Sequence, residues 1–388
     1  MSRALTDLLA TDVQSRGVRL PRANQERLSR RGGAGPSDHQ AMVIDGQTVM
    51  VPVYSHQVLE SPYTLRESVA GDELLKDGIP LVEIELVNQP NFYRLKTADG
   101  VPYQQIATLH STDVLATTVL QTCIRYQSRR KACKFCSIGQ SLAAERTIER
   151  KTPQQLAEVT KAAVELDGVK HMVMTTGTPP TSDRGARILC ESVAAVKEAV
   201  DIPIQVQCEP PKDLNWLTRL REAGADSLGM HIEVITPELR QRLMPGKAEI
   251  TVDDYIAAFA YAVPVFGHAQ VSTYLLAGLG DSESVMLATC GQLIALGVYP
   301  FVVPFVPIRG TPMEDHPAPT PEFMAPLLEQ VGAMLQAAGM HSGQVKAGCA
   351  KCGACTSLNR FEGDTPPLAA KAGAPATSGL ESNGGCLP

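Results

Sequence analysis

The sequence has no long apolar run and no excess of basic residues, and each absence argues against a class of protein. No uninterrupted apolar segment approaches the ~18 residues that a membrane-spanning helix needs. The first ten residues include Asp7 and lack the apolar core of a signal peptide. A net charge of −6 and a pI near 5.8 argue against a general binder of nucleic acid or anionic membranes. We therefore expect a cytoplasmic protein that binds neither nucleic acid nor membrane.

The remaining composition is typical of a globular protein. Hydrophobic residues make up 44% of the chain and charged residues 20%, and 388 residues suffice for one large domain or two smaller ones. Ten cysteines in this setting are better interpreted as metal ligands and reduced thiols than as disulfides. This interpretation favours a reducing compartment.

Three of the cysteines lie in one basic loop, Cys123-Ile-Arg-Tyr-Gln-Ser-Arg-Arg-Lys-Ala-Cys133-Lys-Phe135-Cys136, directly after an apolar run. Thiolates are soft ligands that favour iron–sulfur clusters, zinc or Cu(I). A structural zinc site needs a fourth cysteine or histidine, and the next twenty residues contain neither. A [4Fe–4S] cluster held by three cysteines leaves one iron open for a substrate or cosubstrate. Zinc ligation and unligated thiols remain the alternatives.

Residues 1–110 are expected to form a β-rich module. The stretch 41–53 reads as a hairpin that turns at Asp45-Gly46, and a second strand pair is predicted at 81–87 and 92–95. Before them, Arg31-Gly-Gly-Ala-Gly-Pro-Ser-Asp38 is too rich in glycine for regular structure. This loop either binds an anion or substrate through backbone amides or is a solvated connector.

Residues 111–340 alternate between apolar, β-branched runs and helical segments, which predicts parallel βα units. The predicted strands are 114–121, 170–176, 202–208, 226–232, 269–276 and 298–306. The predicted helices are 153–166, 185–200, 213–223, 253–265 and 282–296. The fold class is therefore α/β, and we expect a partial (βα)6 barrel of the TIM type with reactive groups beyond the carboxyl ends of its strands.

Several predicted strands end in polar residues or glycine. Thr176-Gly177-Thr178 follows the second strand and is either a ligand-binding segment or an ordinary turn. Gln205, Gln207 and Glu209 alternate along the third strand, so all of them can point into the barrel, where buried amides and a carboxylate require polar partners. His231, at the end of the fourth strand, is interpreted as structural. Because no histidine-rich or carboxylate-rich ligand set follows the strands, a zinc-dependent hydrolase is disfavoured.

The closing motif Cys133-Lys-Phe135-Cys136 resembles the Cys-x-aromatic-Cys of radical S-adenosylmethionine (SAM) enzymes, although nine residues separate Cys123 from Cys133 where that family usually has three. The strand ends across 112–340 resemble the biotin and lipoyl synthase branch, whose usual fold is the partial barrel. More narrowly, Arg31–Asp38 together with a cysteine group near the C-terminus resembles the radical SAM protein of bacterial nitrilase gene clusters.

This resemblance implies roles for further residues. Glu233 would contact the ribose hydroxyls of SAM, and Arg240 or Arg242 would pair with its carboxylate, a role that suits the guanidinium fork. The cofactor-binding set implied by the resemblance comprises Phe135, Thr176, Gly177, Thr178, Gln207, Glu233, Arg240, Arg242, Gly278, Gly280, Val306 and Ile308.

A second cysteine group lies near the C-terminus, in Lys346-Ala-Gly-Cys349-Ala-Lys-Cys352-Gly-Ala-Cys355. It predicts that residues 341–361 form an auxiliary metal- or cluster-binding segment. Cys-x2-Cys-x2-Cys is a known iron–sulfur spacing, and structural zinc is the alternative. The fourth ligand is Cys386, a histidine such as His341, or a substrate. Residues 362–388 are rich in Ala, Gly, Pro and Ser and are predicted to be disordered.

Together these features predict a radical SAM enzyme. The resemblance implies that Cys123, Cys133 and Cys136 hold the catalytic [4Fe–4S] cluster, that SAM is cleaved to a 5′-deoxyadenosyl radical, and that this radical takes hydrogen from a small-molecule substrate. A flavodoxin- or ferredoxin-type protein would supply the electron, and sulfur insertion is one option for the final step. The alternative is a non-catalytic iron–sulfur or zinc protein that senses redox state or carries a cluster.

Overall fold

The computed structural model describes residues 3–21, 39–67, 71–128 and 130–363. The predicted anion-binding loop Arg31–Asp38 and the candidate ligand Cys386 lie outside these residues, as does the predicted disordered segment from residue 364 onward. Within the described part, no helix is both long enough and apolar enough to cross a bilayer.

The N-terminal module is a five-stranded sheet in the order β2-β1-β5-β4-β3, covered by helix α1. Its elements are α1 (Arg3–Arg16), β1 (His39–Ile44), β2 (Gln47–Pro52), η1 (His56–Glu60), β3 (Tyr63–Arg66), β4 (Asp72–Lys76) and β5 (Ile79–Leu86). The β1–β2 hairpin turns between Ile44 and Gln47, at the predicted Asp45-Gly46.

The second predicted strand pair is wrong in one member. β5 pairs with β4, whereas Asn91–Arg94 forms a short 3-10 helix, η2. The Asp167 carboxylate accepts the backbone N–H groups of Asn91 at 2.7 Å and of Phe92 at 3.0 Å, which satisfies donors that a strand partner would otherwise take. Phe92 is buried in the core of the second domain, so that domain begins earlier than the predicted boundary at residue 110.

The second domain is built on a seven-stranded sheet in the order β12-β11-β10-β9-β8-β7-β6. Its strands are β6 (Thr108–His110), β7 (Val114–Thr118), β8 (His171–Thr175), β9 (Ile204–Gln207), β10 (Ser227–Gly229), β11 (Val271–Ala277) and β12 (Val298–Pro304). The strands from β7 to β12 are parallel, and β6 joins one edge antiparallel to β7. The sheet curls without closing, which confirms the predicted partial (βα)6 barrel.

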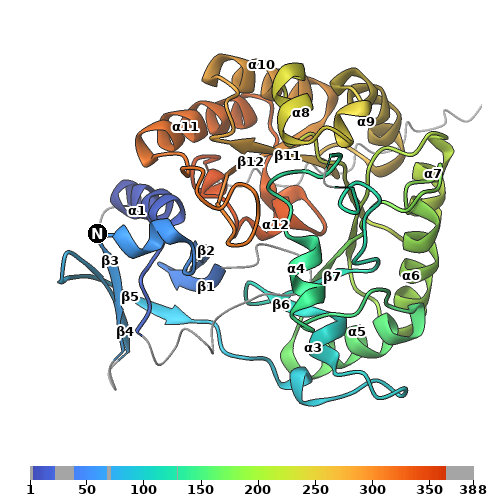
Figure 1. Cartoon of the computed structure of the whole chain (residues 1–388), viewed down its shortest axis with the longest axis horizontal. Helices are drawn as coiled ribbons and strands as arrows, with labels where there is room; N and C mark the ends of the chain where they lie inside the picture. Colours follow the sequence, from blue (N-terminus) through green and yellow to red (C-terminus); the bar gives the residue numbers. More distant parts are fainter. Residues whose placement is uncertain (1–2, 22–38, 68–70, 129, 364–388) are drawn as a thin grey trace, which may run out of the picture.

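Helices connect the parallel strands and lie around the outside of the sheet (Figure 1). The connecting helices are α5 (Pro153–Asp167), α6 (Ala186–Ala199), α7 (Asn215–Glu222), α9 (Val252–Phe266) and α10 (Glu283–Leu296), and α11 (Pro321–Ala337) follows the last strand. Shorter elements fill the connections: α3 (Tyr103–Ile106), α4 (Ile138–Ala143), α8 (Pro237–Leu243) and η3 (Lys247–Glu249). Their ends follow local sequence, because Thr152 and Gln155 form a capping box at the start of α5 and Gly168 ends it in a left-handed conformation.

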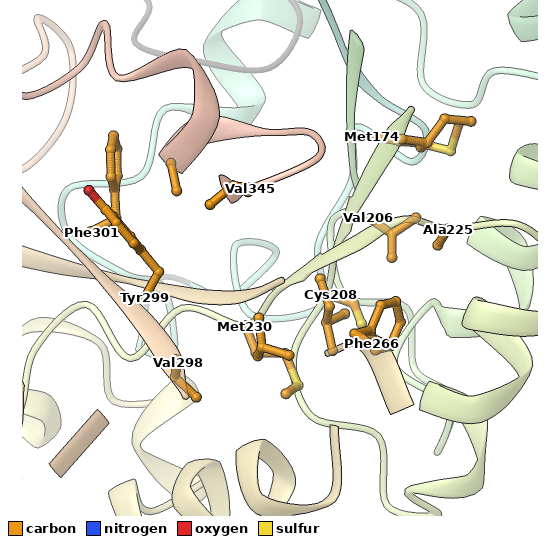
Figure 2. Close-up of a cluster of buried hydrophobic side chains, with 14 of the residues drawn as sticks. Met174, Val206, Cys208, Ala225, Met230, Phe266, Val298, Tyr299, Phe301 and Val345 are labelled. Carbon is orange, nitrogen blue, oxygen red and sulfur yellow. The ribbon is translucent and has the colours of Figure 1, made fainter. Parts of the chain in front are cut away.

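One apolar core joins the sheet to these helices. Figure 2 shows part of it, with Met174 and Val206 from neighbouring strands and Phe301 of β12 near Val345 of the C-terminal segment. Because strands alternate their side chains, the same strands that pack outward against helices also present residues to the interior of the barrel.

The C-terminal segment closes the amino end of the barrel. It consists of η4 (Ser342–Gln344), α12 (Cys349–Cys352) and η5 (Leu358–Arg360). Gly348 donates its N–H to His171 Nδ1 at 3.2 Å, and a Cβ at this position would lie 2.1 Å from Gln205 Cδ. Only glycine therefore allows the segment to enter the barrel this deeply. α12 lies between the N-terminal module and the barrel (Figure 1).

The ordered C-terminal segment extends past the predicted limit of residue 361. The Glu362 side chain is 1% exposed and accepts hydrogen bonds from the Ser342 N–H at 3.0 Å, the Ser342 hydroxyl at 2.6 Å and the Tyr299 hydroxyl. A buried carboxylate is stable when such donors satisfy it. The prediction of disorder from residue 362 is therefore wrong at its first residues, because Glu362 fastens the chain to β12.

A buried amine provides a test of the barrel's packing. Lys151 is 1% exposed, and its Nζ donates to Thr147 Oγ1 at 2.6 Å and Gln121 Oε1 at 3.4 Å. Burial lowers its pKa to about 7, below its ordinary value of 10.5. The pKa of Lys151 is lower in the folded chain than in the unfolded chain. The free energy of unfolding therefore decreases by about 1.4 kcal/mol for each pH unit as the pH falls from 10.5 to about 7.

We therefore expect Lys151→Met to remove most of the rise in unfolding free energy between pH 7 and pH 10, because methionine has no proton to lose. Urea unfolding across that pH range measures the slope. The exposed variant Lys170→Met is the control and should leave the slope unchanged. An undiminished slope in Lys151→Met would contradict the predicted neutral amine.

Candidate functional site

The cysteine loop leaves the carboxyl end of β7 and is fastened to the end of β8. Gly177 donates its N–H to Leu120 O at 2.8 Å, and Ile124 donates to Thr178 O at 2.8 Å. A Cβ on Gly177 would lie 2.2 Å from Thr122 O, so this close approach requires glycine. Gly177 was predicted as a ligand contact; the structure also makes it the residue that seats the cysteine loop.

The three thiols of the loop lie close enough to one another for their charges to interact. Burial raises the pKa of Cys136 to about 12, and both Cys123 and Glu233 raise it further. Burial likewise raises the pKa of Cys133 well above its usual value, with Glu233 contributing. Buried thiols of this kind ionise only beside a strong positive charge, such as a bound metal. The donor set therefore fits a soft cationic group.

Ion pairs connect the loop to the strands opposite. Arg125 reaches Glu209 at 3.3 Å and Glu249 at 2.8 Å, and Lys131 pairs with Glu249 at 2.9 Å. A long insertion between the first two cysteines would otherwise be free to move. These contacts hold it over the mouth of the barrel. The basic character of the loop is the signal in the sequence that indicates these ion pairs.

Glu233, the predicted ribose contact, is paired with a lysine that the sequence analysis missed. Lys247 Nζ lies 2.7 Å from Glu233 Oε2, and both side chains are largely buried. Burial alone would lower the pKa of Lys247, but the Glu233 carboxylate outweighs this and raises it above its ordinary value. Glu233 also has a φ of 66°, a left-handed conformation that costs a residue other than glycine about 1 kcal/mol or more.

A cavity of about 440 Å³ lies inside the barrel and is lined by residues of both cysteine groups. The predicted site residues that line it are Cys123, Cys133, Phe135, Cys136, Thr176, Gly177, Thr178, Gln207, Glu233, Val306, Ile308, Cys349 and Cys355. The lining residues that the sequence analysis did not assign to the site include His110, Arg125, Lys247 and Tyr274. Concave, mostly apolar cavities with a few convergent polar groups are the usual form of ligand sites.

Four predicted SAM contacts do not line this cavity. Arg240 is 2% exposed and donates to the carbonyl oxygens of Ile232 at 2.8 Å, Val234 at 2.7 Å and Ile250 at 2.7 Å, so both terminal nitrogens of its guanidinium bind the backbone. Arg242 is exposed on the same helix. The structure therefore corrects the assignment of Arg240 to the SAM carboxylate and offers no support for Arg242.

The two glycines after β11 also lie away from the cavity. A Cβ on Gly278 would meet Pro319 at 2.8 Å, and one on Gly280 would meet Leu239 at 3.1 Å. Both glycines have positive φ, so their role in the structure is to allow tight packing of the turn. Their predicted approach to an adenosyl group has no support in the geometry.

His231 was interpreted as structural, but its ring faces the cavity. It stacks on Tyr274 with ring centroids 4.3 Å apart, and its Nδ1 accepts the Tyr274 N–H at 3.2 Å. Burial lowers the pKa of His231 to about 3, so the ring is neutral and its proton lies on Nε2. Within the described residues this buried Nε2 has no hydrogen-bond partner, which makes it available to a ligand.

The second cysteine group is reached from the interior of the barrel. Gln207 Nε2 donates to Cys349 Sγ at 3.2 Å, and the Cys349 N–H donates to Gln205 Oε1 at 3.2 Å. Cys355 Sγ lies 3.5 Å from His110 Nε2 on β6. The predicted inward alternation of Gln205 and Gln207 is therefore confirmed, and it brings β9 against the C-terminal cysteines.

The N-terminal module covers these cysteines on the other side. The Met50 N–H donates to Ala354 O at 2.7 Å, and Gln14 Nε2 donates to the same oxygen at 3.1 Å. Met50 and Ala354 share a small apolar cluster with Cys352 and Cys355. The module thereby shields the second cysteine group from solvent.

A protein-family model described as the Radical SAM superfamily matches residues 129–290. Bacteriochlorophyllide c C-7(1)-hydroxylase of Chlorobaculum limnaeum is 23% identical over 343 residues, which cover 82% of this chain and 83% of that protein. Lipoyl synthase of Marinobacter nauticus is 25% identical over 178 residues, which cover 43% of this chain and 47% of that protein. None of these matches bears on the narrower resemblance to nitrilase gene clusters, which stays a prediction.

Two solved structures are similar over about half of each chain. Coproporphyrinogen III oxidase (HemN) from Escherichia coli has a TM-score of 0.36 at 18% identity and covers 54% of this chain and 50% of its own. The FeFe-hydrogenase maturase HydG from Carboxydothermus hydrogenoformans has a TM-score of 0.40 at 19% identity and covers 56% and 49%. The chain thus spans about half the length of these two structures.

Proposed function

We propose that this chain is a radical SAM enzyme that binds a [4Fe–4S] cluster through Cys123, Cys133 and Cys136 and binds SAM beside it, as the match of the Radical SAM superfamily model to residues 129–290 supports. The observation that carries this proposal is that these cysteines and the residues at several strand ends line one cavity. When bound, the cluster supplies the electron that splits SAM into methionine and a 5′-deoxyadenosyl radical, which takes hydrogen from a small-molecule substrate.

Different residues around the cluster loop are proposed to contact different parts of SAM. Lys247, beside Glu233 and close to Cys133, is the cation placed to meet the SAM carboxylate, in the role first assigned to Arg240. Glu233 remains the candidate for the ribose hydroxyls. Phe135 packs with Cys133 in an apolar cluster that keeps water from the cluster loop. Val306 and Ile308 provide the remaining apolar wall.

His231 is proposed to orient the substrate. Its neutral ring offers Nε2–H as a donor, and the stacked Tyr274 fixes the ring plane. The relative that aligns over 82% of this chain is a hydroxylase by name, which favours a final step that oxidises a C–H bond. Sulfur insertion with sulfide from the second cysteine group is the other candidate for this step.

We also propose a second iron–sulfur cluster at Cys349, Cys352 and Cys355. Within the described residues no three cysteine, histidine or acidic side chains converge closely enough to hold one metal ion. The Cys-x2-Cys-x2-Cys spacing of the group, known from iron–sulfur proteins, supports this proposal, and structural zinc is the alternative.

An acidic electron carrier of the flavodoxin or ferredoxin type is the proposed partner. Arg130, Lys131 and Lys134 are exposed on the loop that carries the cysteines. Opposite charges on the two proteins would steer the carrier to this loop and make the encounter sensitive to salt.

The enzyme and the non-catalytic alternative predict different products. An enzyme with the proposed site forms 5′-deoxyadenosine from SAM when dithionite supplies the electron, whereas a cluster carrier or sensor forms none. Chromatography of the reaction after anaerobic reconstitution measures it. Absence of 5′-deoxyadenosine with a full complement of iron would overturn the proposed function.

Iron and acid-labile sulfide analysis tests the number of clusters. We expect about eight irons per wild-type chain and about four in the Cys349/Cys352/Cys355→Ala variant, because each [4Fe–4S] cluster contains four. About four irons in both proteins would rule out the proposed second cluster. If the wild type contains zinc and the variant does not, the second cysteine group is a structural zinc site and not an iron–sulfur site.

A further inference from the structure

We propose that Glu209 binds the protonated amine of a ligand in the cavity. The inference rests on the proposed function, because SAM carries such a group, and an amine on the substrate is the other source that the experiment below separates from it. The proposal gives a role to a carboxylate that the alternation along the third strand singled out and that the chemistry described above leaves unused.

Glu209 lies beyond the carboxyl end of β9, in the wall of the cavity. Its side chain is 8% exposed, and Pro210 and Pro211 follow it. Consecutive prolines have fixed φ angles and hold the residue before them in an extended conformation, so the carboxylate is positioned before any ligand arrives. Among the described residues, Glu209 and Glu233 are the two carboxylates that line the cavity.

The protein itself satisfies the Glu209 carboxylate only in part. Among the described residues, its hydrogen-bond partner is Arg125, whose Nη2 lies 3.3 Å from Oε2, and Oε1 accepts no hydrogen bond. Arg125 also donates to Glu249 at the shorter distance of 2.8 Å. A buried carboxylate is stable when hydrogen-bond donors satisfy it, and an ammonium group brings three of them.

The balance of charge at this wall favours a cation over an anion. The single guanidinium of Arg125 pairs with two carboxylates, Glu209 and Glu249, so these three groups together carry one negative charge. Lys131 also pairs with Glu249, but both of these side chains are more than half exposed, and solvent screens their interaction. A protonated amine at Glu209 would therefore neutralise the buried part of the site.

Lys247 lies near enough to Glu209 for the two charges to interact. Burial lowers the pKa of Lys247, but the carboxylates of Glu233 and Glu209 help to raise it above its ordinary value. An α-amino acid carries its carboxylate and its ammonium on one carbon atom, and Lys247 is the proposed partner of the SAM carboxylate. Glu209 is the matching anion for the ammonium, so we expect SAM to be the source of the amine.

Binding of SAM and of desamino-SAM, in which hydrogen replaces the amino group, tests this role. Equilibrium dialysis of the reconstituted protein without a reductant measures both dissociation constants while SAM stays intact. We expect Glu209→Gln to weaken SAM binding by at least about tenfold and desamino-SAM binding by less than about twofold, because the charge-assisted hydrogen bond needs the amine. Glu249→Gln, the matched control, removes the exposed carboxylate that shares Arg125 and should change both constants by less than about twofold.

An amine on the substrate gives a different pattern. Glu209→Gln then leaves SAM binding unchanged, and saturation-transfer NMR detects n-butylammonium bound to the SAM-loaded wild type but not to the SAM-loaded variant. That result would support the role of Glu209 and assign the amine to the substrate. Unchanged SAM binding together with equal n-butylammonium binding in the two proteins would overturn the role.

A second variant guards against a failure to fold. Glu209→Asp keeps the charge but withdraws it by one methylene group, so it should weaken SAM binding more than desamino-SAM binding. An equal loss for both ligands in a variant that keeps its full iron content would overturn the assignment. A wild type that is loaded with iron but binds neither SAM nor desamino-SAM would instead overturn the proposed function.

Discussion

Cys133→Ala should lose the cluster of the first cysteine loop and with it all cleavage of SAM. Two remaining cysteines cannot hold a cubane cluster that already leaves one iron without a protein ligand. Since the proposed mechanism passes the electron to SAM through this cluster, we expect 5′-deoxyadenosine formation to fall below detection, and iron to fall by about four per chain. Anaerobic reconstitution followed by iron analysis and a dithionite assay measures both quantities.

The control for this variant is Cys190→Ser. Cys190 is a half-buried thiol on α6, outside both cysteine groups, and it does not line the cavity. This variant should keep its iron and its activity. Full iron content with turnover in Cys133→Ala would contradict the assignment of the loop, whereas loss of iron in both variants would point to general sensitivity of the fold.

Lys247→Met should destabilise the protein and weaken SAM binding together. Removing one partner of a largely buried ion pair leaves the Glu233 carboxylate without compensation, at a cost of about 3 kcal/mol. If Lys247 also meets the SAM carboxylate, the apparent affinity for SAM falls by at least about tenfold, since each 1.4 kcal/mol changes a dissociation constant by that factor. Chemical unfolding and SAM titration of the reconstituted protein measure the two effects.

Two further variants separate these effects. The double variant Lys247→Met/Glu233→Gln removes both charges, so it should regain most of the lost stability without regaining affinity for SAM. Lys131→Met breaks the exposed pair with Glu249 and should change stability by less than about 0.5 kcal/mol. Recovery of SAM affinity in the double variant would contradict a direct role for the lysine.

Local patterns in the sequence were sufficient for the secondary structure of the barrel. The predicted helix 153–166 is α5 at Pro153–Asp167, because the capping signal at Thr152 and the terminating Gly168 are local. The prediction of a strand at 92–95 was wrong because the decisive contact is not local. Its apolar residues fit a short strand, but Asp167, 75 residues after Phe92, binds its backbone and draws it against α5.

Charged residues were the least predictable part of the site. Arg240 and Lys247 are both cations near the end of β10, and no local pattern separates the one that binds backbone carbonyls from the one that meets Glu233. The difference depends on which carbonyl oxygens the turn after β10 leaves exposed to each side chain. Only the folded chain fixes those positions.

The sequence by itself determined the alternation of strands and helices and the positions of the two cysteine groups, because periodicity and cysteine spacing are properties of short stretches. The tertiary structure decided that residues of both cysteine groups line one cavity and that His110 lies against Cys355. These contacts join residues far apart in the chain, and they depend on how the sheet curls and on where Gly348 allows the C-terminal segment to enter it.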